Sequence, residues 1–152
     1  MESVSEGNVT RNLGNSKRRQ QRQCIVENLY MWEMQKDVPI EMLYSNYCEE
    51  NVPELSEEIL RADFVLETLR GVVNHVNMID EKIRTYAKNW AFDRIAKMDL
   101  AILRLAIYEL VISKKTPIPV IINEAVELSK VYSSDDSKRF INGMLDRIAK
   151  DL

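Results

Sequence analysis

The amino-acid sequence predicts an all-α protein of about seven helices. Apolar residues recur at helical spacing along most of the chain, and strand-like alternation of apolar and polar residues is absent from the sequence. Hydroxyl and acidic residues also stand where the helices would begin. With only four Gly and four Pro, the chain cannot be collagen-like or a flexible linker.

Length and composition are those of a globular protein. The 152 residues suit one domain, and a hydrophobic fraction of 45% with 30% charged residues excludes wholesale disorder. No apolar run approaches the ~18 residues of a membrane span, and the N-terminus lacks a signal-peptide pattern. Because Cys24 and Cys48 cannot form a disulfide framework, we expect a reduced, cytoplasmic protein.

The first helix is expected to begin near Ser16. Residues 1–15 are polar and aperiodic, so residues 1–16 are predicted to be a disordered tail and 17–152 the helical domain. Ser16 is a suitable N-cap for the apolar row formed by Ile25, Leu29 and Trp32. Pro39 is expected to end or interrupt this helix, and Pro53 to end a short second one.

The middle of the chain is predicted to hold a long amphipathic helix, a shorter helix and a buried helix. Ser56, followed by two glutamates, is the expected N-cap of the long helix, whose apolar row runs to Val76. Asp80 is expected to cap the shorter helix, whose apolar row ends at Trp90. Residues 91–112 are apolar nearly all round, which is typical of the central helix of a bundle.

Two further helix starts are visible near the C-terminus. Thr116 followed by Pro117 indicates a capping hydroxyl with proline at the first helical position. Ser133 and Ser134, followed by two aspartates, indicate the start of the last helix.

Patterns for catalysis and metal binding are missing from the sequence. The single histidine, His75, stands on the rim of an apolar row, and the two cysteines form no CxxC motif. No glycine-rich phosphate loop is present, and helix N-termini explain the paired acids. We therefore expect a protein that is not an enzyme and holds no cofactor or metal.

Charge is distributed unevenly along the chain. Residues 1–26 carry a net charge of +3 and residues 27–152 a net charge of −6, a pattern found in proteins that touch nucleic acid. The helix start bears four cations, which are Lys17, Arg18, Arg19 and Arg22. The helix dipole disfavours each of them by ~0.3–1 kcal/mol, so we interpret the cluster as a binding feature without structural gain. A frayed, solvated helix start is the alternative.

The stretch TPIPVIINEAVELSK places Asn123 and Glu124 inside an otherwise apolar helix. A structural role is favoured, in which one of them satisfies a buried backbone group or an arginine of a neighbouring helix. A functional site at these two residues is the less favoured alternative.

The stretch YSSDDSKRFINGMLD contains Asn142 and Gly143 within a helix, where glycine costs ~1 kcal/mol relative to alanine. Gly143 is therefore expected to permit the close approach of a neighbouring backbone. Lys138 and Arg139 directly precede Phe140, and cations beside an aromatic ring are typical of surfaces that bind single-stranded nucleic acid. Phe140 as an ordinary core residue stays open.

Three stretches carry a resemblance to a known family. RRQQRQCIVENLYMWE, DRIAKMDLAILRLAIYEL and PVIINEAVELSKVYSSDDSKRFINGMLD, together spanning roughly residues 17–150, resemble the NusB family of bacterial transcription antitermination factors. Gln20, Gln21 and Ser129 depart from the family's usual residues. The resemblance implies two packed three-helix bundles. It also implies binding of boxA-type single-stranded RNA together with a small-subunit ribosomal protein (NusE), within an RNA polymerase elongation complex that transcribes ribosomal RNA operons.

The resemblance and the charge pattern together give a set of expected site residues. RNA contacts are expected at Lys17, Arg18, Arg19, Arg22, Tyr30, Asp136, Ser137, Arg139 and Phe140. Asp99 is the expected contact to the protein partner. A helical protein–protein adaptor and a stand-alone accessory domain of a ribosomal-RNA methyltransferase are the alternative functions, and the choice between monomer and homodimer stays open.

Overall fold

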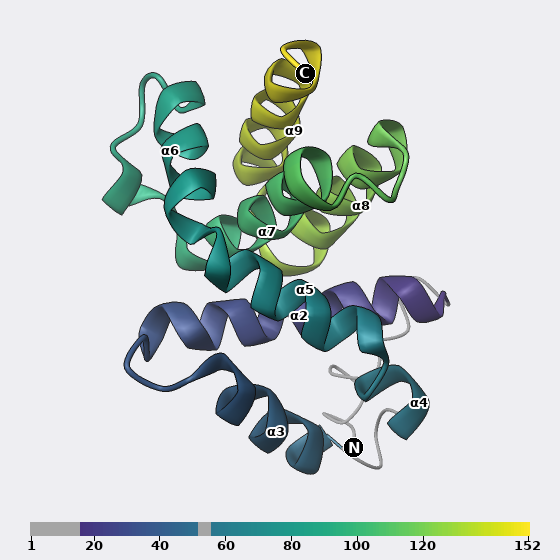
Figure 1. Cartoon of the computed structure of the whole chain (residues 1–152). Helices are drawn as coiled ribbons and strands as arrows, with labels where there is room; N and C mark the ends of the chain where they lie inside the picture. The colour runs from purple at the N-terminus through teal and green to yellow at the C-terminus, as the bar shows by residue number, and fades with distance from the viewer. Residues whose placement is uncertain (1–15, 52–55) are drawn as a thin grey trace. The chain divides into compact units, whose positions relative to one another are not determined.

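The computed structural model describes residues 16–51 and 56–152, and all regular structure within them is helical (Figure 1). The all-α prediction is therefore confirmed. The elements are α2 (Lys17–Met34), α3 (Ile40–Asn51), α4 (Glu57–Leu60), α5 (Asp63–Asn74), α6 (Val76–Tyr86), η1 (Phe92–Arg94), α7 (Lys97–Ile107), η2 (Tyr108–Ser113), α8 (Ile118–Tyr132) and α9 (Asp135–Lys150). Apart from the single-turn α4, seven α-helices lie in the described residues. Of the tail expected at 1–16, residues 1–15 lie outside them, as does the expected break at Pro53.

Contacts divide the chain into two compact units, Met1–Arg70 and Gly71–Leu152. In the first unit α2 packs against α3 and α4. The apolar row of α2 is buried as expected, and α3 adds Leu43 and Tyr47 to the same core. Neither Cys24 nor Cys48 forms a disulfide, and both are buried within this unit.

The second unit is built around α7. The central helix predicted over residues 91–112 begins only at Lys97, after the 3₁₀ turn η1. Every residue from Asp99 to Ile107 is buried, so the prediction of a buried central helix is confirmed for this part. Helices α6, α8 and α9 each pack against α7, and α8 also packs against α9. None of the described helices is long and apolar enough to cross a membrane.

The long helix predicted from Ser56 to Val76 is divided into pieces. Ser56 does cap a helix, because its Oγ accepts a hydrogen bond from the Ile59 N–H at 3.2 Å. That helix is only α4, and a second interruption at His75 separates α5 from α6. The ring Nδ1 of His75 lies 2.7 Å from the carbonyl oxygen of Gly71, so this histidine forms part of the junction. Apolar spacing continues through both breaks, and neither break contains proline, so periodicity could not reveal them.

Two predicted caps were wrong. Asp80 lies inside α6, where its carboxylate accepts hydrogen bonds from Arg104 Nε at 2.9 Å and Arg104 Nη2 at 2.8 Å. Thr116 does not cap α8, because its hydroxyl donates to Glu109 Oε1 at 3.4 Å and Pro117 occupies the N-cap position. In both cases the side chain that the local pattern predicted as a helix cap forms hydrogen bonds with a residue of another segment instead.

Candidate nucleic-acid interface

The basic cluster at the start of α2 makes contacts within the first unit. The Ser16 side chain caps the helix by accepting from the Arg19 N–H at 3.3 Å. Lys17 forms an exposed ion pair with Glu58 at 2.8 Å. The Arg18 guanidinium lies over the Phe64 ring, 3.9 Å from its centroid, and Arg22 lies over the same ring at 5.5 Å. The expectation that these cations bring no structural gain was therefore wrong.

The arginines of this basic cluster differ in how far their side chains are buried. Arg18 is exposed and Arg19 is half-buried, whereas Arg22 retains only 4% of its accessible surface. A phosphate in solvent can therefore reach Arg18 without rearrangement, while Arg22 supports the packing of α2 against α5. An RNA contact at Arg22 stays a prediction that its burial does not favour. Tyr30, farther along α2, is 36% exposed.

Arg22→Ala is expected to lower the free energy of unfolding by about 1–2 kcal/mol, since it removes a partly desolvated cation–π contact and a buried aliphatic stem. Urea unfolding measures the change. Lys17→Ala is the control, because its ion pair with Glu58 is exposed on both sides and contributes less than about 1 kcal/mol. An Arg22→Ala protein as stable as the Lys17→Ala protein would contradict the structural role of Arg22.

In the second unit, the start of α9 forms one wall of an aromatic pocket. Phe140 is half-buried and packs against Trp90, with ring centroids 5.3 Å apart and ring planes inclined by 49°. Trp90 itself is 55% exposed, because α6 ends at Tyr86 and leaves this ring outside the apolar row predicted for it. The cavity has a volume of about 360 Å³ and is lined by Tyr86, Ala87, Lys88, Asn89, Trp90, Arg139, Phe140, Gly143 and Arg147.

The cations of this aromatic pocket differ in how firmly they are held. Arg139 pairs with Asp136 at 2.5 Å, but both side chains are largely exposed, so exchanging the aspartate for a phosphate costs little. Arg147 donates to the carbonyl oxygen of Tyr86 at 3.0 Å and thereby ties α9 to the end of α6. Beside the exposed indole, the aromatic pocket therefore offers one guanidinium held by an exposed ion pair and one that is hydrogen-bonded to the backbone of Tyr86.

Gly143 does not serve a close backbone approach. A Cβ built at Gly143 would have Arg147 Nη1 as its nearest neighbour, at an ordinary contact distance of 3.5 Å. The packing role predicted for this glycine was therefore wrong. Because Gly143 lines the aromatic pocket, its missing side chain leaves the cavity more open.

The buried Asp99 links α7 to the half-buried Ser137 at the start of α9. Asp99 is 5% exposed, and its carboxylate accepts from Ser133 Oγ at 2.5 Å and from Ser137 Oγ at 2.6 Å. Ser134 caps α9 as predicted, by accepting from the Ser137 N–H at 3.2 Å. These bonds fix the turn that presents Arg139 and Phe140. A partner contact at Asp99 stays a prediction, and the use of both carboxylate oxygens does not favour it.

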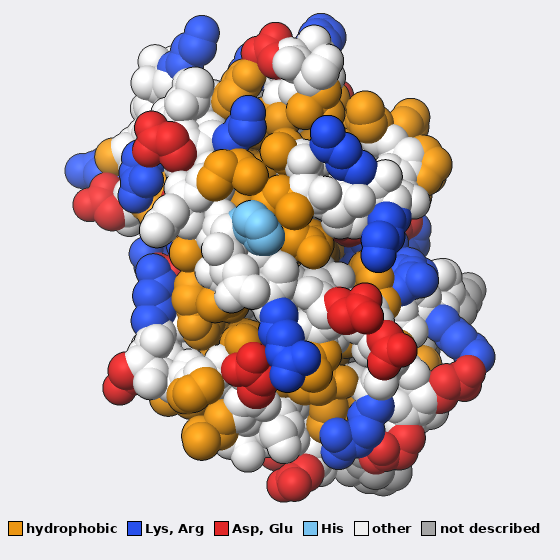
Figure 2. Space-filling model, in the orientation of Figure 1, with side chains coloured by type: hydrophobic (Ala, Val, Ile, Leu, Met, Phe, Trp, Pro, Cys, Tyr) orange, Lys and Arg blue, Asp and Glu red, His pale blue; other side chains and the backbone are white. Residues whose placement is uncertain are grey.

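Charge alone does not mark the interface. On the face shown in Figure 2, basic side chains stand among acidic ones, in line with exposed ion pairs such as Arg70–Glu41 and Arg84–Glu81. What distinguishes the aromatic pocket is the combination of cations with three aromatic side chains, those of Tyr86, Trp90 and Phe140. Among the described residues, no group of three histidine, cysteine or acidic side chains is placed to hold a metal ion.

A model of the NusB family matches residues 19–150, which is nearly the whole of the 152-residue chain. The chain belongs to the NusB family. A transcription antitermination protein NusB of Methylacidiphilum infernorum (isolate V4) is 39% identical over 134 residues, covering 88% of this chain and 91% of that protein. The NusB of Clostridium tetani (strain Massachusetts / E88) is 46% identical over 104 residues, covering 65% of this chain and 68% of that protein.

Solved structures agree with this family membership. The structure of T. maritima NusB has a TM-score of 0.77 and 34% sequence identity, and the match covers 88% of this chain and 91% of that chain. A crystal structure of antitermination factors NusB and NusE in complex with dsRNA also has a TM-score of 0.77, with 23% identity and coverage of 90% and 98%. The second likeness shows that the NusB fold is shared.

Within this NusB-family chain, sequence reasoning missed part of the aromatic pocket. Lys88 and Arg147 were not selected, and Trp90 was assigned to an apolar row. The available signal in the sequence was Trp90 two positions after Lys88. This pair indicates a binding site only once the contact between Trp90 and Phe140 is known. Of the two residues of which one was expected to satisfy a buried group, Asn123 is exposed and Glu124 is half-buried, so a structural role for Glu124 stays a prediction.

Proposed function

We propose that this NusB-family chain acts in transcription antitermination by binding boxA-type single-stranded RNA. In this role it acts with the small-subunit ribosomal protein NusE in the RNA polymerase elongation complex, and it promotes processive transcription of ribosomal RNA operons. The cytoplasm, where bacterial RNA is synthesised, is the corresponding location. The single observation that carries the RNA-binding part is the Trp90–Phe140 pocket with Arg139 and Lys88 in its lining.

The chemistry of the aromatic pocket suits a single strand. Stacking of one base on an aromatic side chain contributes about 1–3 kcal/mol and tolerates different base sequences. Arginine offers several donors in a planar fork that matches a phosphate. Trp90 supplies an exposed ring face, and Arg139 supplies the guanidinium next to Phe140. This binding role requires no catalytic group.

A protein partner compensates for a small RNA footprint. The body of the chain carries a net charge of −6 over residues 27–152 and therefore repels phosphate. Attraction therefore comes from local clusters of cations, such as those of α2 and of the aromatic pocket, and we expect modest affinity for the chain alone. NusE bound to the same RNA would extend the footprint through effective concentration.

The test is a fluorescence anisotropy titration of a boxA-type RNA with wild type, Trp90→Leu and Phe140→Leu, each with and without NusE. Losing a stacking partner is expected to weaken binding by about 5- to 100-fold. Phe92→Leu is the matched control, because Phe92 packs under Arg84 and does not line the aromatic pocket. We expect its affinity to stay within about twofold of wild type.

A salt series completes this test. Each phosphate contact contributes about −0.7 to the slope of log affinity against log salt for a single strand, so a clear negative slope is expected. A flat salt dependence, or full affinity in Trp90→Leu, would contradict the proposal. Binding of NusE without any RNA affinity would instead favour the protein–protein adaptor.

A further inference from the structure

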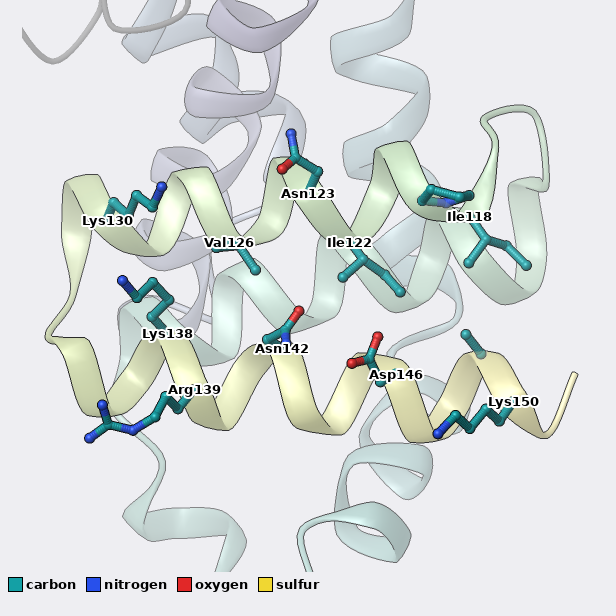
Figure 3. Close-up of a pocket in the computed structure, with 12 residues that line it drawn as sticks. Ile118, Ile122, Asn123, Val126, Lys130, Lys138, Arg139, Asn142, Asp146 and Lys150 are labelled. Atoms are coloured by element: carbon teal, nitrogen blue, oxygen red, sulfur yellow. The ribbon is translucent and has the colours of Figure 1, made fainter.

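A groove runs between α8 and α9 in the second unit (Figure 3). Its cavity volume is about 780 Å³. Each helix contributes one row of side chains spaced four residues apart, which places a row on one helix face. The α8 row is Ile118, Ile122, Val126 and Lys130, and the α9 row is Lys138, Asn142, Asp146 and Lys150. Figure 3 shows the apolar side chains of α8 turned toward α9, and Asn142 and Asp146 turned toward α8.

The lining of the α8–α9 groove is basic, although residues 27–152 as a whole carry a net negative charge. Four cations line it, namely Lys130, Lys138, Arg139 and Lys150, against a single acid, Asp146. Lys130 pairs with Glu127 at 2.9 Å and Lys138 with Asp135 at 3.9 Å, but these are partly exposed i,i+3 pairs whose acids lie outside the lining. Such pairs contribute little free energy, so the ammonium groups can turn to a polyanion.

Arg139 connects the α8–α9 groove to the aromatic pocket, because it lines both cavities. Lys130 and Lys138 lie at the end of the groove where α9 begins, and Arg139 follows Lys138 directly (Figure 3). A strand whose base stacks on Trp90 or Phe140 would therefore pass Arg139 and meet this pair of lysines next. Beyond them, the amides of Asn123 and Asn142 can donate to and accept from base edges.

We propose that the α8–α9 groove is the track of the RNA strand that continues beyond the aromatic pocket. This inference rests on the proposed function. Between Lys138 and Lys150, α9 advances about 18 Å, and a stacked strand advances about 3.4 Å per nucleotide, so the track has room for about five nucleotides. The apolar wall of α8 could also receive a protein segment, but the four cations and the continuity through Arg139 favour RNA.

The experiment compares a boxA-type core RNA with the same RNA extended by five uridines at its 5′ end or at its 3′ end. Affinities of the full chain are measured across a salt series. We expect one extension to tighten binding at least about tenfold and to steepen the salt slope by about 2, the value for three additional phosphate contacts at −0.7 each. The other extension, which leads away from the groove, should add little.

Two triple variants assign the gain to the groove. Lys130→Gln, Lys138→Gln and Lys150→Gln together should abolish the gain from the extension, measured as the ratio of the affinities of the same variant for the extended RNA and for the core RNA. The control triple is Lys82→Gln, Lys114→Gln and Lys115→Gln, which removes the same charge from the same unit outside the groove. It should retain the gain.

The outcomes separate the track from the proposed function. If the core RNA binds but neither extension tightens binding, or if the groove triple keeps the gain, the track is wrong and the proposed function stands. If the groove triple instead loses affinity for NusE with no effect on extended RNA, the groove receives protein and the track is wrong. If the core RNA itself does not bind, both are wrong.

Discussion

Asp80→Ala is expected to lower the free energy of unfolding by about 3–5 kcal/mol, the usual cost of breaking a buried ion pair from one side. Arg104 has no accessible surface, and Asp80 holds its guanidinium through two hydrogen bonds of 2.9 Å and 2.8 Å. Removing the carboxylate leaves a buried cation on α7 with its main acceptor gone. Urea unfolding followed by circular dichroism measures the change.

Two further variants test the cause of this loss. Glu41→Ala removes the exposed Arg70–Glu41 pair, which has a similar distance of 3.0 Å, and should cost less than about 1 kcal/mol. The double variant Asp80→Leu, Arg104→Met replaces both charges with apolar groups and should recover most of the stability, because the desolvated charge is gone. If Asp80→Ala costs no more than Glu41→Ala, the buried pair does not stabilise the second unit.

Gly71→Ala is expected to destabilise the protein by about 1–3 kcal/mol, although alanine is the better helix former by ~1 kcal/mol. A Cβ at Gly71 would lie 2.3 Å from Tyr108 Oη and 2.4 Å from Cζ of the same ring. The tyrosine ring packs directly on this turn of α5, so it must move to admit a methyl group. Thermal unfolding reports the effect.

Gly143→Ala provides the matched comparison. Gly143 also lies within a helix, but its added Cβ would meet only Arg147 Nη1 at 3.5 Å. This variant is therefore expected to be more stable by about 0.5–1 kcal/mol, as helix propensity alone predicts. Tyr108→Phe should restore part of the stability lost in Gly71→Ala, since it removes the nearest atom. If Gly71→Ala and Gly143→Ala changed the stability equally, the Tyr108 ring would move aside without a measurable cost in free energy.

Local signals were sufficient for much of the fold. Ser16 and Ser134 were identified as helix caps because a capping hydroxyl acts within the first turn that it precedes. Residues 91–112 were predicted to form the central helix because a helix that is apolar nearly all round is stable only when other helices surround it, and the structure buries residues 99–107 of this range. The interruption at His75 was missed because the apolar spacing runs through it unchanged.

Local sequence also predicted only the part of the site whose residues are neighbours in the chain. Arg139 and Phe140 were selected from their neighbours in sequence, and the structure places both in the aromatic pocket. Trp90 comes from a different segment, and Arg147 comes from a later turn of α9. The residues next to them in sequence do not indicate that both line the same pocket as Phe140. A pocket assembled from several segments is visible only once those segments are packed together.

The sequence by itself determined the all-α class, the helix starts at Ser16 and Ser134, and the resemblance to the NusB family. The tertiary structure decided what individual residues do. Arg22 has a structural role because Phe64 lies beside it, and Gly71, not Gly143, is the sterically required glycine because Tyr108 covers it. Burial and steric contact depend on which distant side chain lies next to a residue, and local sequence does not contain that information.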